Sequence, residues 1–254
     1  MSLVPLILLA LLLPAATAAP VDVWADGVSQ EQGWRDYNKS FDGSDNDLCW
    51  AITATNIIDW WQNRHPDVVP ASTPKGEEIM RTFVQSFSNA GSDPDEGLAW
   101  WFTGEYHPGR PECAARKESA TGAYLRNALP DDRPFRQHTL KALRGPAVTA
   151  ESAATALIEG AEAGAAFWIG VSYTSPAGRA AMHSLNVWGV RVDTAANGSR
   201  HLCGIWIADS DDRKTGLTYV PVKADDGMLV FHCPDHPIYS RMPRIVIDTI
   251  SSLR

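Results

Sequence analysis

The sequence predicts an α+β fold, in which helices from the first half of the chain pack on an antiparallel sheet from the second half. Two observations predict it. Up to Gly164 the apolar residues recur mainly at helical spacing, and beyond it the chain breaks into short runs rich in β-branched and aromatic residues. Helices followed by antiparallel strands are typical of the α+β class. The chain has 254 residues, 44% of them hydrophobic, which is enough for one domain-sized core.

The N-terminus predicts export. Residues 1–19 hold an apolar run from Leu3 to Leu13, followed by small residues that end in Ala16-Thr17-Ala18, a pattern typical of a secretory signal peptide and its cleavage site. A membrane anchor is the alternative, but the run is shorter than the ~20 apolar residues that a spanning helix needs. We therefore expect a signal peptide at 1–19 and one domain at 20–254, secreted or periplasmic, with no membrane partner after signal removal.

The net charge of −8 argues against a nucleic acid or an anionic membrane surface as partner, because both need a basic face.

Four segments of the first half are predicted as helices. The first runs from Leu48 to Asn63, with Asp47 as its cap and apolar residues around most of its circumference, so we expect it to be central and buried. The others start at Thr73-Pro74, at Asp93-Pro94 and at Thr149. The segment from Thr103 to Pro146, rich in Pro, Arg and Gly, is interpreted as long loops.

Six segments after Gly164 are predicted as strands. In order, they are AAFWIGVSY, HSLNVWGVRV, LCGIWIAD, LTYVPVK, MLVFHC and RIVIDTI. Ala196–Ser199 and Asp225–Gly227 have the composition of hairpin turns between neighbouring strands.

Cys49 stands at the first turn of the predicted central helix. There the helix dipole and the unpaired backbone N–H groups both stabilise a thiolate, which lowers the pKa of a thiol from about 8.5. The same N–H groups can stabilise an oxyanion. A buried structural cysteine and one half of a disulfide are the alternatives. An exported chain with four cysteines can hold two bridges, and Cys203 with Cys233 is the more plausible pair if Cys49 is a working thiol, although connectivity cannot be deduced from sequence.

His183 is the candidate base for Cys49. Their separation falls within the roughly 130–150 residues typical of papain-type enzymes. If the strands on either side of Ala196–Ser199 form a hairpin, Asp209 lies opposite the start of the first strand and can orient the imidazole of His183. A solvated acidic turn or a weak cation site is the alternative for residues 209–212.

Two other interpretations carry less weight. His232 and His236 flank Cys233, but no second ligand pair at zinc-finger spacing accompanies them, so we expect neither metal nor cofactor. The ten tryptophans could form a carbohydrate-binding platform, yet most lie in apolar runs and are better explained by core packing.

Three stretches together resemble one family. QGWRDYNKSFDGSDNDLCWAITATNIIDWW, MHSLNVWGV and IWIADSDD resemble, in order and spacing, the IdeS/Mac family of secreted bacterial cysteine endopeptidases, which cleave immunoglobulin G near the hinge on a papain-like fold. The resemblance covers the chain from about Gln32 to Asp212, with a looser similarity at GSDPDEGLAWWFTG.

The resemblance implies a role for each matching residue. Cys49 would be the nucleophile, His183 the base and Asp209 its orienting acid, with Asp211 as a supporting carboxylate. Lys39 would help the Cys49 backbone N–H to stabilise the oxyanion. The resemblance also implies a papain-like domain over 20–254 and the immunoglobulin G heavy chain as substrate.

The chain also departs from the family. Trp50 follows the cysteine where the best-known members carry glycine, the middle loops are shorter, and three additional cysteines are present. The sequence therefore predicts a cysteine endopeptidase more firmly than its immunoglobulin specificity. An acyl transferase or amidase with the same three groups, or a secreted binding protein with a vestigial triad, are the alternatives.

Overall fold

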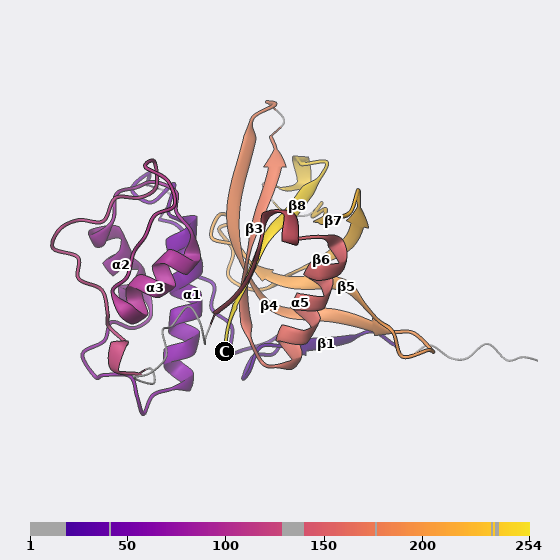
Figure 1. The fold of residues 1–254 in the computed structure, drawn as a ribbon, viewed down its shortest axis with the longest axis horizontal. Coiled ribbons are helices and arrows are strands. Elements are labelled where there is room, and N and C mark those ends of the chain that lie inside the picture. Colours follow the sequence, from indigo (N-terminus) through magenta and orange to yellow (C-terminus); the bar gives the residue numbers. More distant parts are fainter. Residues whose placement is uncertain (1–18, 41, 129–139, 176, 235, 237–238) are drawn as a thin grey trace, which may run out of the picture.

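The computed structural model describes residues 19–40, 42–128, 140–175, 177–234, 236 and 239–254. The predicted signal peptide lies outside the described residues except for Ala19, so it stays a prediction. Within the described ranges, no helix has the length and apolar character to cross a bilayer. Helices α1, α2 and α3 form one layer, and the strands with α5 form the other (Figure 1).

Eight strands within the described part of the chain form one antiparallel sheet, and six of them close into a barrel. The barrel strands are, in sheet order, β4 (Ala180–Thr194), β3 (Ala166–Thr174), β8 (Ile245–Leu253), β7 (Met228–Phe231), β6 (Thr218–Asp225) and β5 (Arg200–Ala208), with β5 pairing back to β4. The two additional strands are β1 (Val21–Trp24), which pairs with β4, and β2 (Leu140–Arg144), which pairs with β8.

The barrel shows that the predicted α+β, papain-like fold is wrong. The reason lies in the last strand, β8. It pairs with β7 on one edge and on the other with β3, the first barrel strand in the chain, so that the sheet returns to its own start. Irregularities in register at Gly170/Val171 and Val187/Gly189 mark bulges, which bend a strand and increase its twist. Strand composition predicts each strand but not this closure.

The predicted strands and turns agree with the structure more closely than the fold class does. All six segments form strands, and the turn between β4 and β5 is closed by a 2.8 Å hydrogen bond from Ala195 N–H to Ser199 O. Asp225 pairs with Met228 across the second predicted turn. The sequence analysis missed β1 and β2, the latter within the segment interpreted as loops.

Helix α1 (Cys49–Arg64) is central and buried, as predicted: every residue from 50 to 62 is buried. Asp47 is not its cap. The N-cap is Leu48, whose N–H bonds the backbone O of Asp45 at 3.0 Å, and no side chain caps this end of the helix. The predicted cap was therefore wrong by one residue, and the first turn begins at Cys49.

The other helices either match their predicted extents or are shorter. Helix α2 (Glu77–Ser86) begins only after Gly76, whose positive φ of 58° breaks the helix. Asp93 caps α3 (Pro94–Thr103), and Thr149 caps α5 (Ala150–Glu162) through a reciprocal pair with Ser152. The described residues also include three short 3₁₀ turns: η1 (Arg126–Ala128), η2 (Gly145–Ala147) and η3 (Tyr239–Arg241).

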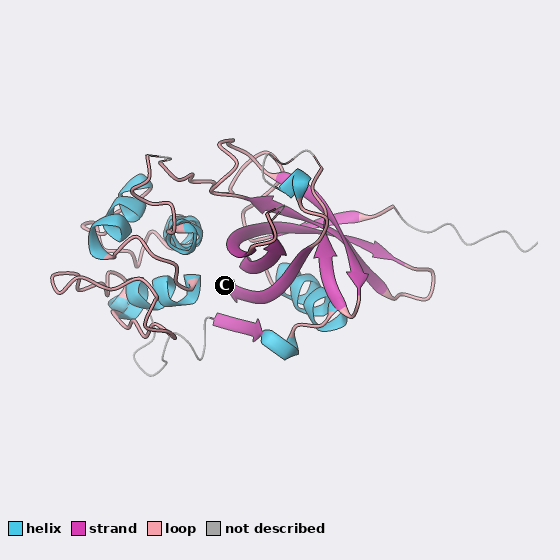
Figure 2. Cartoon of the chain, turned by 90° about the horizontal axis from the view of Figure 1, so that it is seen from above, coloured by secondary structure: helices cyan, strands magenta, loops and turns pink. Residues whose placement is uncertain are grey.

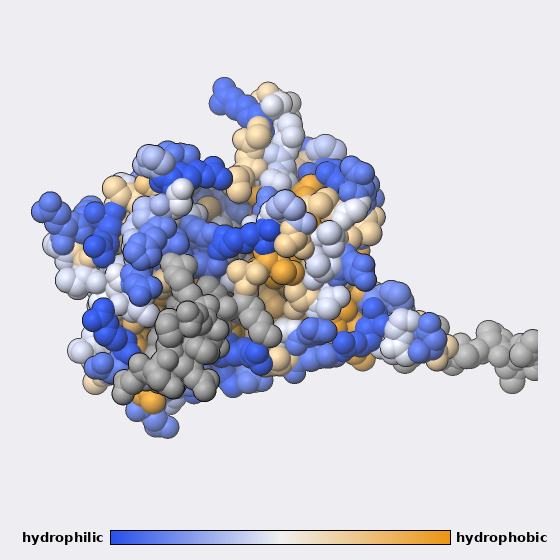
Figure 3. Space-filling view, in the orientation of Figure 1, coloured by the Kyte–Doolittle hydropathy of each residue, from blue (hydrophilic) through white to orange (hydrophobic). Residues whose placement is uncertain are grey.

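The fold has two hydrophobic cores. Aromatic residues of α1, α2 and α3, such as Trp50 and Phe83, fill the helical layer, and Trp188 of β4 packs into the same core from the barrel. Leu157 and Ile158 of α5 join the apolar residues inside the barrel, because α5 packs against the strands (Figure 2). Most of the tryptophans are buried, which favours core packing over a carbohydrate platform. The outer surface is mainly hydrophilic on the face drawn in Figure 3.

Candidate active site

Buried polar contacts join the two layers beside the candidate site. Thr53 of α1 donates from Oγ1 to the backbone O of Ser184 on β4 at 3.1 Å. One turn further, the amide of Asn56 donates to Asn186 Oδ1 at 2.8 Å, and Asn186 donates to the backbone O of Thr53 at 3.1 Å. These bonds fix the start of α1 against β4, so Cys49 and His183 face each other from different layers.

Cys49 is the first residue of α1 and is half-buried. Burial by itself would raise the pKa of its thiol, but the charge and hydrogen bond of His183 outweigh it. The charge of Lys39 and the backbone N–H of Ser184 act in the same direction, so the pKa of Cys49 is lowered overall. The environment therefore favours a thiolate.

His183 lies on β4 with only 5% of its side chain exposed, and its Nε2 is 2.8 Å from Asp209 Oδ1. Burial would lower the pKa of this imidazole. The charges of Asp209 and Cys49, with their hydrogen bonds, instead raise the pKa well above its usual value. Because Nε2 faces Asp209, the hydrogen bond between His183 and the Cys49 thiol is made by Nδ1. A thiolate and an imidazolium therefore stabilise each other.

Asp209 follows β5 directly, and the predicted hairpin explains its position. Asn186 pairs with Ala208, which brings the end of β5 beside His183. Asp209 Oδ1 also accepts from the backbone N–H of Asp211 at 2.9 Å. Burial would raise the pKa of the Asp209 carboxyl, but His183 and His236 hold it far below its usual range. The carboxylate therefore stays ionised.

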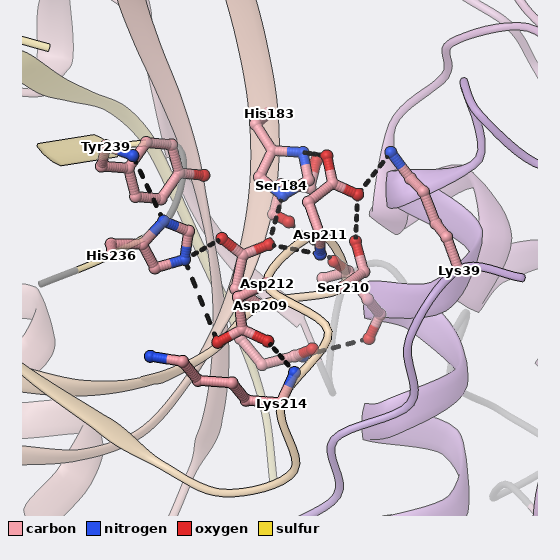
Figure 4. Close-up of polar contacts among 12 residues, drawn as sticks. Lys39, His183, Ser184, Asp209, Ser210, Asp211, Asp212, Lys214, His236 and Tyr239 are labelled. Carbon is pink, nitrogen blue, oxygen red and sulfur yellow. Dashed lines mark hydrogen bonds and ion pairs between the residues drawn. The ribbon is translucent and has the colours of Figure 1, made fainter. Parts of the chain in front are cut away.

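Lys39 and Asp211 form a partly buried ion pair at the edge of the site, with Lys39 Nζ 2.7 Å from Asp211 Oδ1 (Figure 4). The backbone N–H of Lys39 bonds Ser210 O at 3.0 Å, which fixes the lysine beside the loop after β5. Asp211 Oδ2 is 3.9 Å from His183 Nδ1. The structure thus brings together all five residues that the sequence analysis selected, although Lys39 and Asp211 had been selected on resemblance alone.

Two further residues at this site were not predicted as part of it. His236, considered only as a zinc ligand, lies with Nε2 3.0 Å from Asp209 Oδ2, and Tyr239 stacks on its ring. Both follow β7 and reach the site only because β7 and β5 belong to one barrel. No local sequence pattern signals such a contact.

One group among the described residues has the composition of a metal site. His183, Asp209 and Asp211 each offer a ligand atom within 4.8 Å of the others. These atoms already pair with one another and with Lys39, so the group is explained by its own ion pairs. His232 does not join His236, because its Nδ1 bonds the backbone O of Met242 at 3.2 Å.

None of the four cysteines, all of which lie within the described ranges, forms a disulfide. Cys203 and Cys233, the more plausible pair in the sequence analysis, are therefore not bridged. Strand β6 lies between β5, which carries Cys203, and β7, which ends just before Cys233. Two strand spacings of about 4.8 Å exceed the Cα separation that a disulfide spans.

Cys49 and His183 line a cleft of about 630 Å³ between the two layers. Residues 91–94 form the helical wall, while Trp168 and Gly170 form part of the barrel wall. Met182 stands at the rim with 67% of its surface exposed. The cleft gives an extended ligand access to the thiol.

No model of a known protein family matches the sequence, and neither does any curated protein. The resemblance to the IdeS/Mac family therefore stays a prediction. Judged on its own groups, the arrangement can supply a thiolate nucleophile, a proton donor and acceptor, an ionised carboxylate and a fixed cation.

Proposed function

We propose that the protein is a cysteine endopeptidase that hydrolyses peptide bonds with Cys49, His183 and Asp209. One observation carries the proposal: the thiol of Cys49, its pKa lowered, interacts with an imidazole whose Nε2 bonds a buried carboxylate at 2.8 Å. A nucleophile, a base in contact with it and a third group that orients the base are the parts that covalent catalysis needs.

In the proposed reaction the Cys49 thiolate attacks the peptide carbonyl carbon. The resulting oxyanion is stabilised by the Cys49 backbone N–H and by the ammonium of Lys39, which Asp211 holds in position. His183 gives its Nδ1 proton to the leaving amine, and the C–N bond breaks to leave a thioester. His183 then takes a proton from water as the water attacks the thioester, and the acid product leaves with regeneration of the thiolate.

Immunoglobulin G is the substrate that we propose to test first. This part of the proposal, with secretion and membership of the IdeS/Mac family, rests on the three resembling stretches that contain Cys49, His183 and Asp209. The open cleft supports a polypeptide substrate, because a chain can enter along the seam between the layers.

The test is mass spectrometry of immunoglobulin G and of denatured casein after incubation with the wild type or with Cys49→Ala. Cys113→Ala is the matched control, since Cys113 lines the same cleft. We expect one hinge-proximal cut in immunoglobulin G that only Cys49→Ala abolishes. Cleavage of casein alone would keep the endopeptidase and reject the immunoglobulin substrate.

Other products would replace the endopeptidase proposal. Release of ammonia or cross-linking of the substrate would identify an amidase or an acyl transferase that uses the same three groups. If nothing is modified and Cys49 reacts with iodoacetamide no faster than Cys113, the site is vestigial and the protein is a binding protein.

A further inference from the structure

His236 lies on the side of Asp209 opposite His183, in the segment between β7 and η3, and only 2% of its surface is exposed. Its Nε2 is 3.0 Å from Asp209 Oδ2, whereas His183 contacts Oδ1 (Figure 4). The two carboxylate oxygens thus face two different imidazoles.

The protonation of His236 follows from its other nitrogen. The backbone N–H of Tyr239 donates to Nδ1 of His236 at 3.2 Å. A ring nitrogen that accepts a hydrogen bond carries no proton, so the proton of the ring is on Nε2, which lies 3.0 Å from Asp209 Oδ2. His236 thus presents a donor atom to the carboxylate.

The orientation of the His236 ring is also restrained. The ring stacks on Tyr239, with centroids 4.3 Å apart and planes 17° from parallel. Its backbone N–H bonds Cys233 O at 3.2 Å, and its backbone O accepts from Ser240 N–H at 3.1 Å. Asp212 is a further charged neighbour, with its Oδ2 4.0 Å from Nε2. Because the His236 ring is fixed, its Nε2 can restrain the orientation of the Asp209 carboxylate.

We propose that His236 is a positioning residue of the active site: it donates from Nε2 to Asp209 Oδ2 and so keeps Oδ1 directed at His183. The proposal rests on the proposed function. An Asp carboxylate turns readily about its last torsion, which has broad minima. Binding the second oxygen separately restricts that rotation.

The test compares variants that differ in the donor at position 236. His236→Phe keeps a ring to stack on Tyr239 but has no donor, while His236→Gln places an amide N–H donor at the end of a side chain of similar length. His232→Phe and His232→Gln are the matched controls, because His232 bonds Met242 O and touches neither Asp209 nor His183. We would measure kcat and KM, with concentrations corrected by titration of the Cys49 thiol.

We expect His236→Phe to lower kcat about ten- to hundredfold, as loss of a hydrogen bond to a charged acceptor does, with KM changed less than about twofold. His236→Gln should recover most of kcat, and the His232 variants should match the wild type. If His236→Phe does not fold, His236→Met and His236→Gln give the same comparison, since they differ mainly in the donor.

Two results would overturn the proposal. One is an unchanged kcat per titrated thiol in the donor-free variant. The other is equal loss in His236→Gln and the donor-free variant, which would make His236 a packing residue only. A second readout separates this proposal from the endopeptidase: the rate at which iodoacetamide alkylates Cys49 at pH 6 should fall in His236→Phe. If the wild type cleaves nothing but this rate still falls, the proposed function fails and the positioning role stands.

Discussion

Replacement of Asp209 by asparagine tests the electrostatics of the site with little change of shape. The amide oxygen can still accept from His183 Nε2 and from the backbone N–H of Asp211, which now contact Oδ1 at 2.8 and 2.9 Å. The new amide N–H₂, however, replaces Oδ2 and faces the Nε2–H of His236 at 3.0 Å. The variant therefore loses a charge and sets two donors against each other.

The size of the effect follows from the contact between His183 and Asp209. An opposite charge this close usually shifts a pKa by roughly 1–3 units. At about 1.4 kcal/mol per unit, the imidazolium of His183 loses about 1.4–4 kcal/mol of stabilisation in Asp209→Asn. Its pKa falls, the thiolate of Cys49 loses its counter-charge, and we expect kcat/KM at pH 7 to decrease about ten- to thousandfold.

Alkylation of Cys49 by iodoacetamide between pH 5 and 9, located by peptide mass spectrometry, measures the thiolate directly. In the wild type the rate should stay high towards pH 5, because the imidazolium of His183 holds the thiolate. In Asp209→Asn it should fall as the pH drops below the range of an ordinary thiol, about 8.5. Asp212→Asn is the matched control, because it removes a neighbouring carboxylate charge that lies 4.0 Å from His236 Nε2. An Asp209→Asn profile equal to the wild type, with cleavage within about threefold, would refute the electrostatic account.

Three further predictions concern the surroundings of the site. Lys39→Met removes the cation beside Cys49 and should raise the pKa of its thiol and lower kcat about a hundredfold, measured by the same alkylation profile and by steady-state kinetics. Burial raises the pKa of Asp36 to about 7, above the ~4 of an unfolded aspartate, so its protonated form contributes stability at pH 4 that is lost as the pH rises to about 7. Asp36→Asn should therefore increase the free energy of unfolding in urea by about 3–4 kcal/mol more at pH 8 than at pH 4, and an equal effect at both pH values would contradict this reasoning. In Gly189→Ala the added Cβ would lie 2.4 Å from the Trp24 ring, so we expect a loss of about 1–3 kcal/mol in thermal unfolding, against little change in the unobstructed control Gly109→Ala.

Local patterns predicted the α-helices, six of the eight strands that the structure describes, and one long-range contact. The periodicity around Trp50 predicted a buried helix, and the turn at Ala196–Ser199 predicted the hairpin that brings Asp209 to His183. Both arguments succeed because each depends on neighbouring residues or on one tight turn. The prediction of Asp47 as the helix cap was wrong, because a backbone hydrogen bond from Leu48 N–H to Asp45 O precedes the helix instead.

Features that depend on distant segments could not be predicted. Closure of the barrel requires β8 to pair with β3, although four strands lie between them in the chain. The contact of His236 with Asp209 joins the segment after β7 to the end of β5, which no single turn brings together. Lys39 lies in a segment without helical or strand pattern, so only the resemblance to a family drew attention to it.

The nucleophile and the base belong to different layers, and this division has a consequence for when the chain becomes reactive. Cys49 starts the central helix of one layer, while His183 lies on the barrel, and the contacts of Thr53 and Asn56 with β4 hold the two together. Trp188 of the barrel also packs into the core of the helices, so that core is complete only when the two layers meet. Until then the thiol has no base beside it, and we expect a chain still being synthesised to carry a dormant thiol.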